Sequence, residues 1–255
     1  VGSIAVKLAT WNIGGGILGE SHQKGGVPSL DYHASLLEEH APDVVCLQEA
    51  HDYQSRRESQ SEYLAHRAGY RHVASFPISE SHLEEDAHLA LGILSRFPMR
   101  NMVCKKFPNP ALEVIGPDGD RWRLHDKGYV AVTLDLGDRE LALVNAHCFP
   151  LRRFGARPDE AWSAHVGDML ADDLIAIRAA RPALAAMDLN HEPIQDLLME
   201  ALRPGGYINA LEKTATTPKG VQQDYILYDH AVRLLATTVT ATRSDHAYCQ
   251  ASFLV

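Results

Sequence analysis

Hydrophobic residues along the chain gather in short runs, and turn-forming residues separate one run from the next. Most runs are rich in Val, Leu and Ile and are bounded by Pro, Gly or Asp, which is typical of buried β-strands. Gly137 and Asp138 lie between two neighbouring runs, so the pattern predicts a hairpin there. We predict strands at residues 4–12, 43–49, 89–96, 129–136, 140–147, 183–190, 223–228 and 248–255.

Helical periodicity lies between some of these strands. Residues 29–41 place apolar side chains at helical spacing, residues 54–68 carry a thinner apolar stripe, and residues 158–179 show a clear amphipathic face. The antiparallel hairpin argues against a purely parallel sheet, and no linker-like tract or repeat divides the chain. We therefore predict one α/β domain over residues 1–255, with two sheets packed on each other and helices outside.

No apolar run approaches the roughly 18 residues of a membrane-spanning helix, so we expect no integral membrane segment. The chain enters a strand-like segment without a charged and then apolar leader, so no signal peptide is expected. We expect a cytoplasmic protein on these grounds, and a monomer. The cysteines form no CxxC pair and are expected to be free thiols in a reducing compartment: Cys46, Cys104, Cys148 and Cys249.

Composition limits the way in which the protein can bind a phosphate compound. Of 255 residues, 45% are hydrophobic, which is enough to bury a full core. Lys and Arg number 24 against 33 Asp and Glu, so the formal net charge is −9. This negative net charge excludes binding of polyanions through an overall positive charge. A phosphate partner must therefore be held by local groups or by metal. The 14 His residues add potential metal ligands and acid–base groups.

Carboxylate, amide and imidazole side chains stand at or beside the ends of predicted strands. Each has an ordinary structural explanation as a cap, a turn residue or a solvated strand end. Their joint order along the chain is what indicates a shared site, and Asp188 and Asn190 alternate so that both face one side of a strand. The set is Asn12, Glu49, His147, Asp188, Asn190, Asp224, Asp245 and His246.

In this order the sequence resembles the endonuclease/exonuclease/phosphatase superfamily of exonuclease III-like and DNase I-like phosphoesterases. The resemblance covers essentially the whole chain. It implies a four-layer α/β/β/α sandwich, with two mixed, mostly antiparallel sheets packed face to face, outer helices and the site at one end. It also implies Mg²⁺ or Mn²⁺ as the metal. The matching motifs are Trp11–Asn12, Leu47–Glu49, Leu94–Pro98, Asn145–His147, Met187–Asn190, Gln223–Leu227 and Ser244–His246.

The sequence departs from the family pattern at three positions. Met187 stands where the family usually has Gly, and Ala146 replaces a usual threonine. Gly14 stands where many nuclease members carry an acid, which weakens an assignment to abasic-site enzymes.

The residue types fit metal-assisted phosphoester hydrolysis. Mg²⁺ prefers oxygen ligands, and Glu49 is the best single candidate for a direct ligand. The resemblance implies that Asn12 and Asp245 complete the metal shell, while Asp188 and Asn190 align the attacking water or hold a second ion.

Three further side chains complete the expected chemistry. His246 is the candidate general base or phosphate contact, and Asp224 would hold its tautomer and raise its basicity. His147 would donate to a non-bridging phosphate oxygen in the transition state. No serine or cysteine nucleophile is needed, because water attacks in line.

Basic and aromatic residues in two loop-rich stretches are candidates for substrate contacts. Arg152 and Arg153 follow the His147 strand and suit phosphate oxygens, although a solvated loop explains them equally well. A second rim that contacts an anionic substrate is the weaker interpretation of Arg121, Arg123 and Lys127 in the stretch 105–127. Aromatic side chains that can stack on a base or simply pack are Trp122, Phe149 and Phe154. For His191 we expect a structural role.

We therefore predict a divalent-metal-dependent phosphodiesterase that hydrolyses phosphoester bonds by in-line attack of water, with DNA as the expected substrate. A phosphatase or a phospholipid or inositol-phosphate phosphodiesterase of the same fold is the first alternative. The second is a non-catalytic binding protein that kept the fold, and the competent residue at every catalytic position disfavours it.

Overall fold

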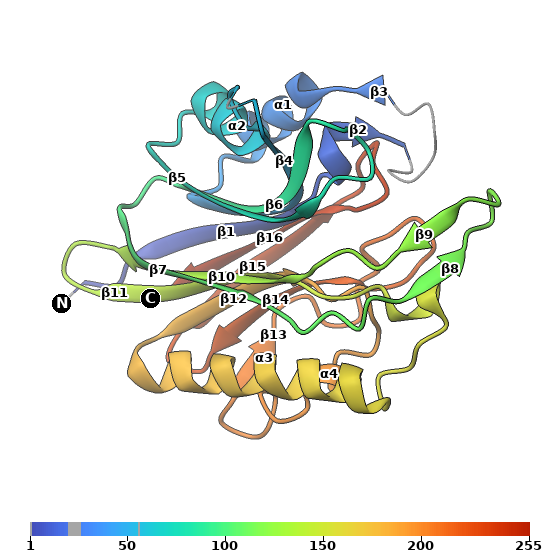
Figure 1. The fold of residues 1–255 in the computed structure, drawn as a ribbon. Coiled ribbons are helices and arrows are strands. Elements are labelled where there is room, and N and C mark those ends of the chain that lie inside the picture. The colour runs from blue at the N-terminus through green and yellow to red at the C-terminus, as the bar shows by residue number, and fades with distance from the viewer. Residues whose placement is uncertain (1, 20–26, 56) are drawn as a thin grey trace.

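The structure is a computed structural model that describes residues 2–19, 27–55 and 57–255. Two six-stranded sheets pack face to face, and helices cover the outer face of each one (Figure 1). The layers follow the order α/β/β/α, which confirms the predicted sandwich.

The first sheet has the strand order β15-β16-β1-β4-β6-β5. Its central pair, β1 and β4, is parallel, while the neighbouring pairs are antiparallel. The sheet is therefore mixed, as predicted. Its strands are β1 (Ala5–Asn12), β4 (Val44–Tyr53), β5 (His72–Glu80), β6 (Ala87–Ser95), β15 (Arg233–Thr240) and β16 (Tyr248–Leu254).

The second sheet has the order β13-β14-β12-β11-β10-β7. Strands β11 and β12 are parallel, and β10 and β11 form the predicted antiparallel hairpin, in which Asp135 pairs with Glu140. The strands are β7 (Met99–Lys106), β10 (Gly128–Asp135), β11 (Glu140–His147), β12 (Ala183–Asp188), β13 (Tyr207–Asn209) and β14 (Asp224–Asp229).

The helices lie close to their predicted positions. Helix α1 (Leu30–His40) and helix α2 (Gln60–Ala68) cover the first sheet, while α3 (Ala161–Ala180) and the short α4 (Gln195–Leu198) cover the second (Figure 1). Helix α2 begins later than the predicted residue 54, because a capping box ends the preceding turn. The Ser59 hydroxyl accepts from the Glu62 amide, and the Glu62 carboxylate accepts from the Ser59 amide.

The edge strands β5, β7, β13 and β15 escaped prediction, because none of their sequences carries a long continuous apolar run. Strands β15 and β5 are the two edges of the first sheet, and β7 is an edge of the second. Most side chains of β7 and β15 are exposed. The stretch 105–127 contains a hairpin of β8 (Glu113–Ile115) and β9 (Arg121–Arg123).

The remaining short elements lie near the same end of the molecule as that hairpin (Figure 1). They are β2 (Ile17–Leu18), β3 (Val27–Pro28) and the 3-10 turns η1 (Gly14–Gly16) and η2 (Leu151–Phe154).

The main core lies between the sheets and explains why the central strands read as apolar runs, since these strands are buried on both faces. Leu8, Leu143 and Phe253 are among the fully buried members of this core. Separate apolar clusters lie under α1 and α2, around Trp11, and under α3, around Leu174.

One buried amide crosses the main core and ties the two sheets together. Asn145 of β11 donates to the carbonyl oxygens of Leu47 and Gly92, at 2.9 and 2.8 Å, and accepts from Gln48 Nε2 at 2.8 Å. Buried polar groups of this kind hold a single relative position of the elements that they join. The contact lies a few residues from the strand ends that carry the candidate site.

Two expectations from the sequence concern individual segments. Within the described residues, no helix is long and apolar enough to cross a membrane. The four cysteines are free thiols, as expected. Cys46, Cys148 and Cys249 are buried, whereas Cys104 is exposed on β7.

Candidate active site

Strand pairing brings three of the predicted residues to one end of the second sheet. His147 is the last residue of β11 and pairs with Asp188, the last residue of β12. Asp188 pairs on its other side with Asp224, the first residue of β14, because β14 runs antiparallel to β12. The ends of two parallel strands and the start of an antiparallel one therefore coincide.

The first sheet brings its own predicted residues to the same end. Asn12 closes β1 and pairs with Gln48 of the parallel strand β4, so Glu49 follows directly. His246 lies two residues before β16, which runs antiparallel to β1. Packing of the two sheets then brings both sets of strand ends face to face.

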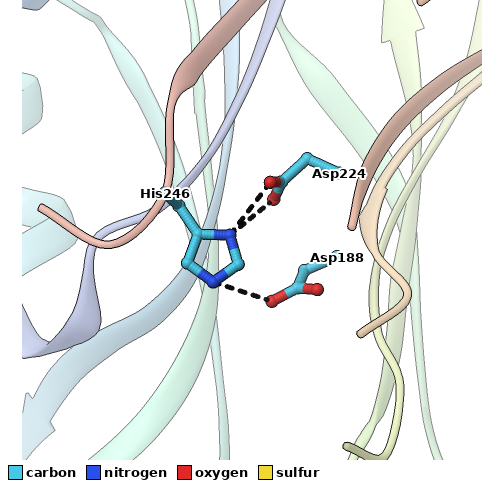
Figure 2. A group of neighbouring side chains, drawn as sticks. All are labelled: Asp188, Asp224 and His246. Atoms are coloured by element: carbon cyan, nitrogen blue, oxygen red, sulfur yellow. Dashed lines mark hydrogen bonds and ion pairs between the residues drawn. The ribbon is translucent and has the colours of Figure 1, made fainter. Parts of the chain in front are cut away.

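The centre of the site joins residues from both sheets (Figure 2). His246 Nδ1 lies 2.9 Å from Asp224 Oδ2 and 3.2 Å from Oδ1, and its Nε2 lies 3.8 Å from Asp188 Oδ2. All three side chains are buried. Their ligand atoms lie within 4.8 Å of one another, as in a group that can hold a metal ion.

Asp188 is held in one orientation by hydrogen bonds to both carboxylate oxygens. Oδ2 accepts from Asn12 Nδ2 at 2.9 Å, and Oδ1 accepts from the backbone amide of Asn190 at 2.8 Å. Asn190 has a left-handed backbone, with φ of 53°, which turns the chain directly after the strand. Its side-chain amide lies 2.9 Å from His147 Nε2, so Asn190 also orients the imidazole.

Glu49 occupies a strained position in a β-bulge. The register between β4 and β6 shifts between Leu47 and Ala50, and Glu49 has a φ of 54°. A non-glycine residue with this backbone conformation costs about 1–3 kcal/mol and persists where the surroundings hold it. Bulges re-aim side chains, and this one directs the Glu49 carboxylate toward the candidate site.

A buried lysine lies inside the site. Lys127 Nζ is 3.3 Å from Glu49 Oε1 and 3.0 Å from His147 Nε2. The sequence analysis grouped Lys127 with Arg121 and Arg123, and the structure places all three in the lining of one pocket, where the Lys127 side chain is only 6% exposed. The rule of strand ends would have found it, since Lys127 precedes Gly128, which pairs with His147 across the hairpin.

His246 and His147 lie in opposite electrostatic surroundings, which shift their pKa values in opposite directions. Burial alone would lower the pKa of His246, but the charges of Asp224 and Asp188 outweigh burial and raise this pKa to about 10. Burial lowers the pKa of His147 well below its ordinary value, and the Lys127 ammonium lowers it further. At neutral pH, His246 is therefore a cation and His147 is neutral. In this arrangement His147 Nε2 lies 3.0 Å from Lys127 Nζ, 2.9 Å from Asn190 Nδ2 and 3.4 Å from Asp188 Oδ2.

The carboxylates differ as well. Burial raises the pKa of Asp188 to about 6, against the favourable charge of His246. Burial would also raise the pKa of Glu49, but the charge of Lys127 reverses this effect and holds the pKa below its usual range. Asp188 is thus a carboxylate with unusually high basicity, while Glu49 stays ionised.

The donor set suits a hard divalent cation. The site as a whole holds two cations, Lys127 and His246, and four carboxylates, those of Glu49, Asp188, Asp224 and Asp245. Carboxylates therefore outnumber cations by two. A divalent ion would offset that difference, and oxygen ligands are those that Mg²⁺ and Mn²⁺ prefer.

The predicted metal ligands overlap only in part with the group drawn in Figure 2. Asp188 belongs to both. Asn12 directs its amide nitrogen at Asp188, and its oxygen accepts from the Gly14 amide at 3.0 Å. Asp245 is half-buried beside His246 and contributes to the raised pKa of that imidazole.

The structure separates the candidate substrate residues. Arg153 and Phe154 line a pocket that Glu49 and Lys127 also line, whereas Arg152 is exposed and does not line it. Phe149 is buried and packs against Trp162, with ring centroids 5.8 Å apart, so its role is packing.

Two further sequence-based roles can be compared with the structure. His191 Nε2 lies 2.9 Å from Asp196 Oδ2, outside the group in Figure 2, in line with the structural role we expected. Arg121, Trp122 and Arg123 of the β8–β9 hairpin line the same pocket as Arg153.

Comparison with known proteins agrees with this arrangement of motifs. A sequence model of the Endonuclease/Exonuclease/phosphatase family matches residues 9–246. Among curated proteins, no sequence matches the chain significantly.

Solved structures share the fold over nearly the whole chain. An endonuclease/exonuclease/phosphatase from Beutenbergia cavernae DSM 12333 matches with a TM-score of 0.72 and 20% identity, over 98% of this chain and 71% of the other. The human Nocturnin catalytic domain with bound sulfate anion has a TM-score of 0.68 and 18% identity, over 98% and 93%. A humanized D. rerio TDP2 has a TM-score of 0.62 and 16% identity, over 98% of both chains. At these identities the likeness is one of fold.

Proposed function

Because the chain belongs to the endonuclease/exonuclease/phosphatase family, we propose that it is a hydrolase that cleaves phosphodiester bonds with the help of Mg²⁺ or Mn²⁺. Water attacks the phosphorus in line, and nucleic acid, with DNA first, is the proposed substrate. The observation that carries this proposal is the buried contact of His246 with Asp224, next to an Asp188 that Asn12 and Asn190 orient.

Asp188 is the base that we propose for the attacking water. Its pKa of about 6 lies close to neutral pH, where a base combines ionisation with proton affinity most effectively. The hydrogen bonds from Asn12 and Asn190 fix its orientation, so a water molecule that donates to Asp188 would meet the phosphorus from one defined side. The proton leaves water for Asp188 as the new P–O bond forms and the P–O bond to the leaving group breaks.

His246 contacts the phosphate in this scheme. It is protonated at neutral pH and donates from Nδ1 to Asp224, so Nε2 carries a second proton that a non-bridging oxygen can accept. The electrostatics therefore favour the second of the two roles that the sequence left open for His246.

Lys127 supplies a second positive charge, because its ammonium lies between Glu49 and His147. This ammonium, and not His147, is the donor that we propose for the other phosphate oxygen. A divalent ion held by these carboxylates would polarise the phosphoryl group and offset its negative charge.

The experiment measures hydrolysis of bis-p-nitrophenyl phosphate and of plasmid DNA by the full chain after EDTA treatment, with and without added Mg²⁺ or Mn²⁺. We expect activity to depend on the added ion. We also expect Asp188→Asn to lower kcat by about 10²–10⁴-fold, the usual contribution of a general base.

Asp173→Asn is the matched control, because Asp173 pairs with Lys105 on the outer side of the second sheet. Its activity should equal that of the natural sequence. Undiminished hydrolysis in EDTA, or full activity of Asp188→Asn, would overturn the proposal. Parallel assays of phosphatidylinositol phosphates, sphingomyelin and phosphomonoesters decide between nucleic acid and the alternative substrates.

A further inference from the structure

A pocket of about 310 Å³ opens directly beside the proposed reaction centre. Glu49 and Lys127 form the wall that it shares with the site, and Arg153 and Phe154 of the turn η2 form another part of the lining. The β8–β9 hairpin, which projects past the end of the sheets (Figure 1), contributes Arg121–Arg123. The volume falls at the lower end of the roughly 300–1,000 Å³ of pockets that hold small ligands.

The pocket carries a local positive charge, which is opposite in sign to the net charge of the protein as a whole. Arg121 and Arg123 both pair with Glu113, at 3.1 and 3.0 Å, so one carboxylate offsets two guanidinium groups. Arg153 adds a third guanidinium to the lining, and the Lys127 ammonium faces Glu49. In a chain with a net charge of −9, these residues form a local excess of positive charge. A guanidinium binds phosphate oxygens in a fixed fork, so the pocket suits an anionic group in addition to the phosphate that reacts.

The pocket also offers flat aromatic surfaces. The Trp122 indole is half-buried and rests on the hairpin backbone, because a Cβ at Gly116 would lie 2.3 Å from its Cε2 atom. His82 and His125 stack with centroids 4.9 Å apart and also line the pocket. Burial, with the nearby charges of His82 and Lys127, lowers the pKa of His125 to about 4, so this imidazole is a neutral ring at pH 7. Planar rings bind such surfaces by stacking.

We propose that this pocket binds one nucleoside unit that carries a second phosphate, so the substrate is the phosphorylated end of a short oligonucleotide, and the reacting phosphate is the diester that joins this unit to the rest of the oligonucleotide. The reacting phosphate lies against Lys127 and Glu49, the ring lies among the aromatic residues, and the second phosphate meets the hairpin arginines and Arg153. The inference rests on the proposed function and specifies its substrate. A long duplex fits less well, because its affinity would need positive charge along an extended surface.

The first test is direct binding to the full chain in EDTA, where no hydrolysis is expected. Adenosine 3′,5′-bisphosphate is compared with adenosine 5′-monophosphate, adenosine and inorganic phosphate by titration calorimetry, and quenching of tryptophan fluorescence reports stacking on Trp122. We expect the bisphosphate to bind at least about tenfold more tightly than the monophosphate, because its second phosphate adds a charge-assisted contact. Equal affinity for the two nucleotides would overturn the proposal.

Variants locate the binding site. Arg123→Ala and Arg153→Ala should each weaken bisphosphate binding about tenfold, and Trp122→Ala should weaken it while Trp122→Phe retains most of it. Arg203→Ala is the matched control, because Arg203 is an exposed arginine that pairs with Glu200 at 2.6 Å and does not line the pocket. Unchanged affinity in both arginine variants would show that the bisphosphate binds elsewhere and would overturn the proposal.

The two proposals can fail separately. If the chain hydrolyses bis-p-nitrophenyl phosphate but shows no preference for the bisphosphate, the substrate inference fails and the proposed hydrolase activity stands. If the bisphosphate binds as expected in EDTA but no phosphoester is cleaved when metal is restored, the proposed activity fails and the pocket assignment stands.

Discussion

His246 and Asp224 connect the two sheets of the sandwich through a buried hydrogen bond, with Nδ1 2.9 Å from Oδ2. Asp224 begins β14 of the second sheet, whereas His246 precedes β16 of the first. The charge of Asp224 is the largest influence that raises the pKa of His246, so the protonation of this imidazole depends on correct packing of one sheet on the other.

Replacing Asp224 by Asn should remove this effect. We expect the pKa of His246 to fall from about 10 toward or below its ordinary value, because burial then acts with less opposition. Loss of the phosphate-contacting cation should lower kcat by about 10²-fold or more. NMR titration of His246 and hydrolysis of bis-p-nitrophenyl phosphate measure the two effects. Asp196→Asn, which removes the carboxylate partner of His191, is the control and should leave activity unchanged.

Lys127 should contribute to folding stability as well as to phosphate binding. Lys127→Met leaves the Glu49 carboxylate largely buried without this ammonium, and breaking a buried pair in this way costs about 3–5 kcal/mol. Urea unfolding in EDTA should detect the loss, and the double variant Lys127→Met with Glu49→Gln should recover most of it. The same change at Lys105, whose pair with Asp173 is far more exposed, should cost about 1 kcal/mol or less. Equal losses of stability for Lys105→Met and Lys127→Met would contradict the stabilising role of the buried Lys127–Glu49 pair.

Asn145 should be a stability determinant without being part of the reaction. Asn145→Ala removes the side-chain donor to the Leu47 and Gly92 carbonyl oxygens and one of the two acceptors of Gln48 Nε2, which keeps its bond to Thr10 Oγ1. Each unsatisfied buried group costs about 1–3 kcal/mol, so we expect a loss of at least about 2 kcal/mol in the free energy of unfolding. Urea denaturation measures it, and the exposed Gln195→Ala should change stability by no more than about 0.5 kcal/mol. A loss below about 1 kcal/mol for Asn145→Ala would mean that the core rearranges to satisfy these groups.

His33 should make stability depend on pH at a point remote from the reaction. Its imidazole is fully buried against Trp11, with ring centroids 4.5 Å apart, and burial lowers its pKa to about 4. Between pH 6.5 and 4 the unfolded chain binds a proton that the folded chain does not bind. The contribution of neutral His33 to the free energy of unfolding is therefore complete above pH 6.5. About 3 kcal/mol of this contribution is lost as the pH falls toward 4.

His33→Gln tests this dependence, because the amide can still donate to the Ser29 carbonyl oxygen that His33 Nδ1 contacts at 2.8 Å. Between pH 7.5 and 4.5, the free energy of unfolding should fall less steeply in this variant than in the natural sequence. His66→Gln is the control, since the His66 side chain is 88% exposed, and it should leave the slope unchanged. An unchanged slope in His33→Gln would refute the assignment to His33.

The central strands and the candidate site residues could be predicted from the sequence for a common physical reason. Strands such as β11 and β12 are buried on both faces, so they appear as apolar runs, and the polar residues that end them stand out. His147 and Asp188 are recognisable because each is the last residue of such a run. The edge strands β7 and β15 carry solvated side chains and offer no comparable signal.

Only the tertiary structure decided how these residues act on one another. The bulge at Glu49, the burial of Lys127 and the distance from His246 to Asp224 all depend on packing between segments far apart in the chain. An electrostatic influence falls off with distance and grows with burial, and the sequence reveals neither quantity. The sequence therefore determined which groups are available at this end of the sandwich. The packing of the two sheets decided which histidine is charged, which carboxylate is basic and where a second phosphate can bind.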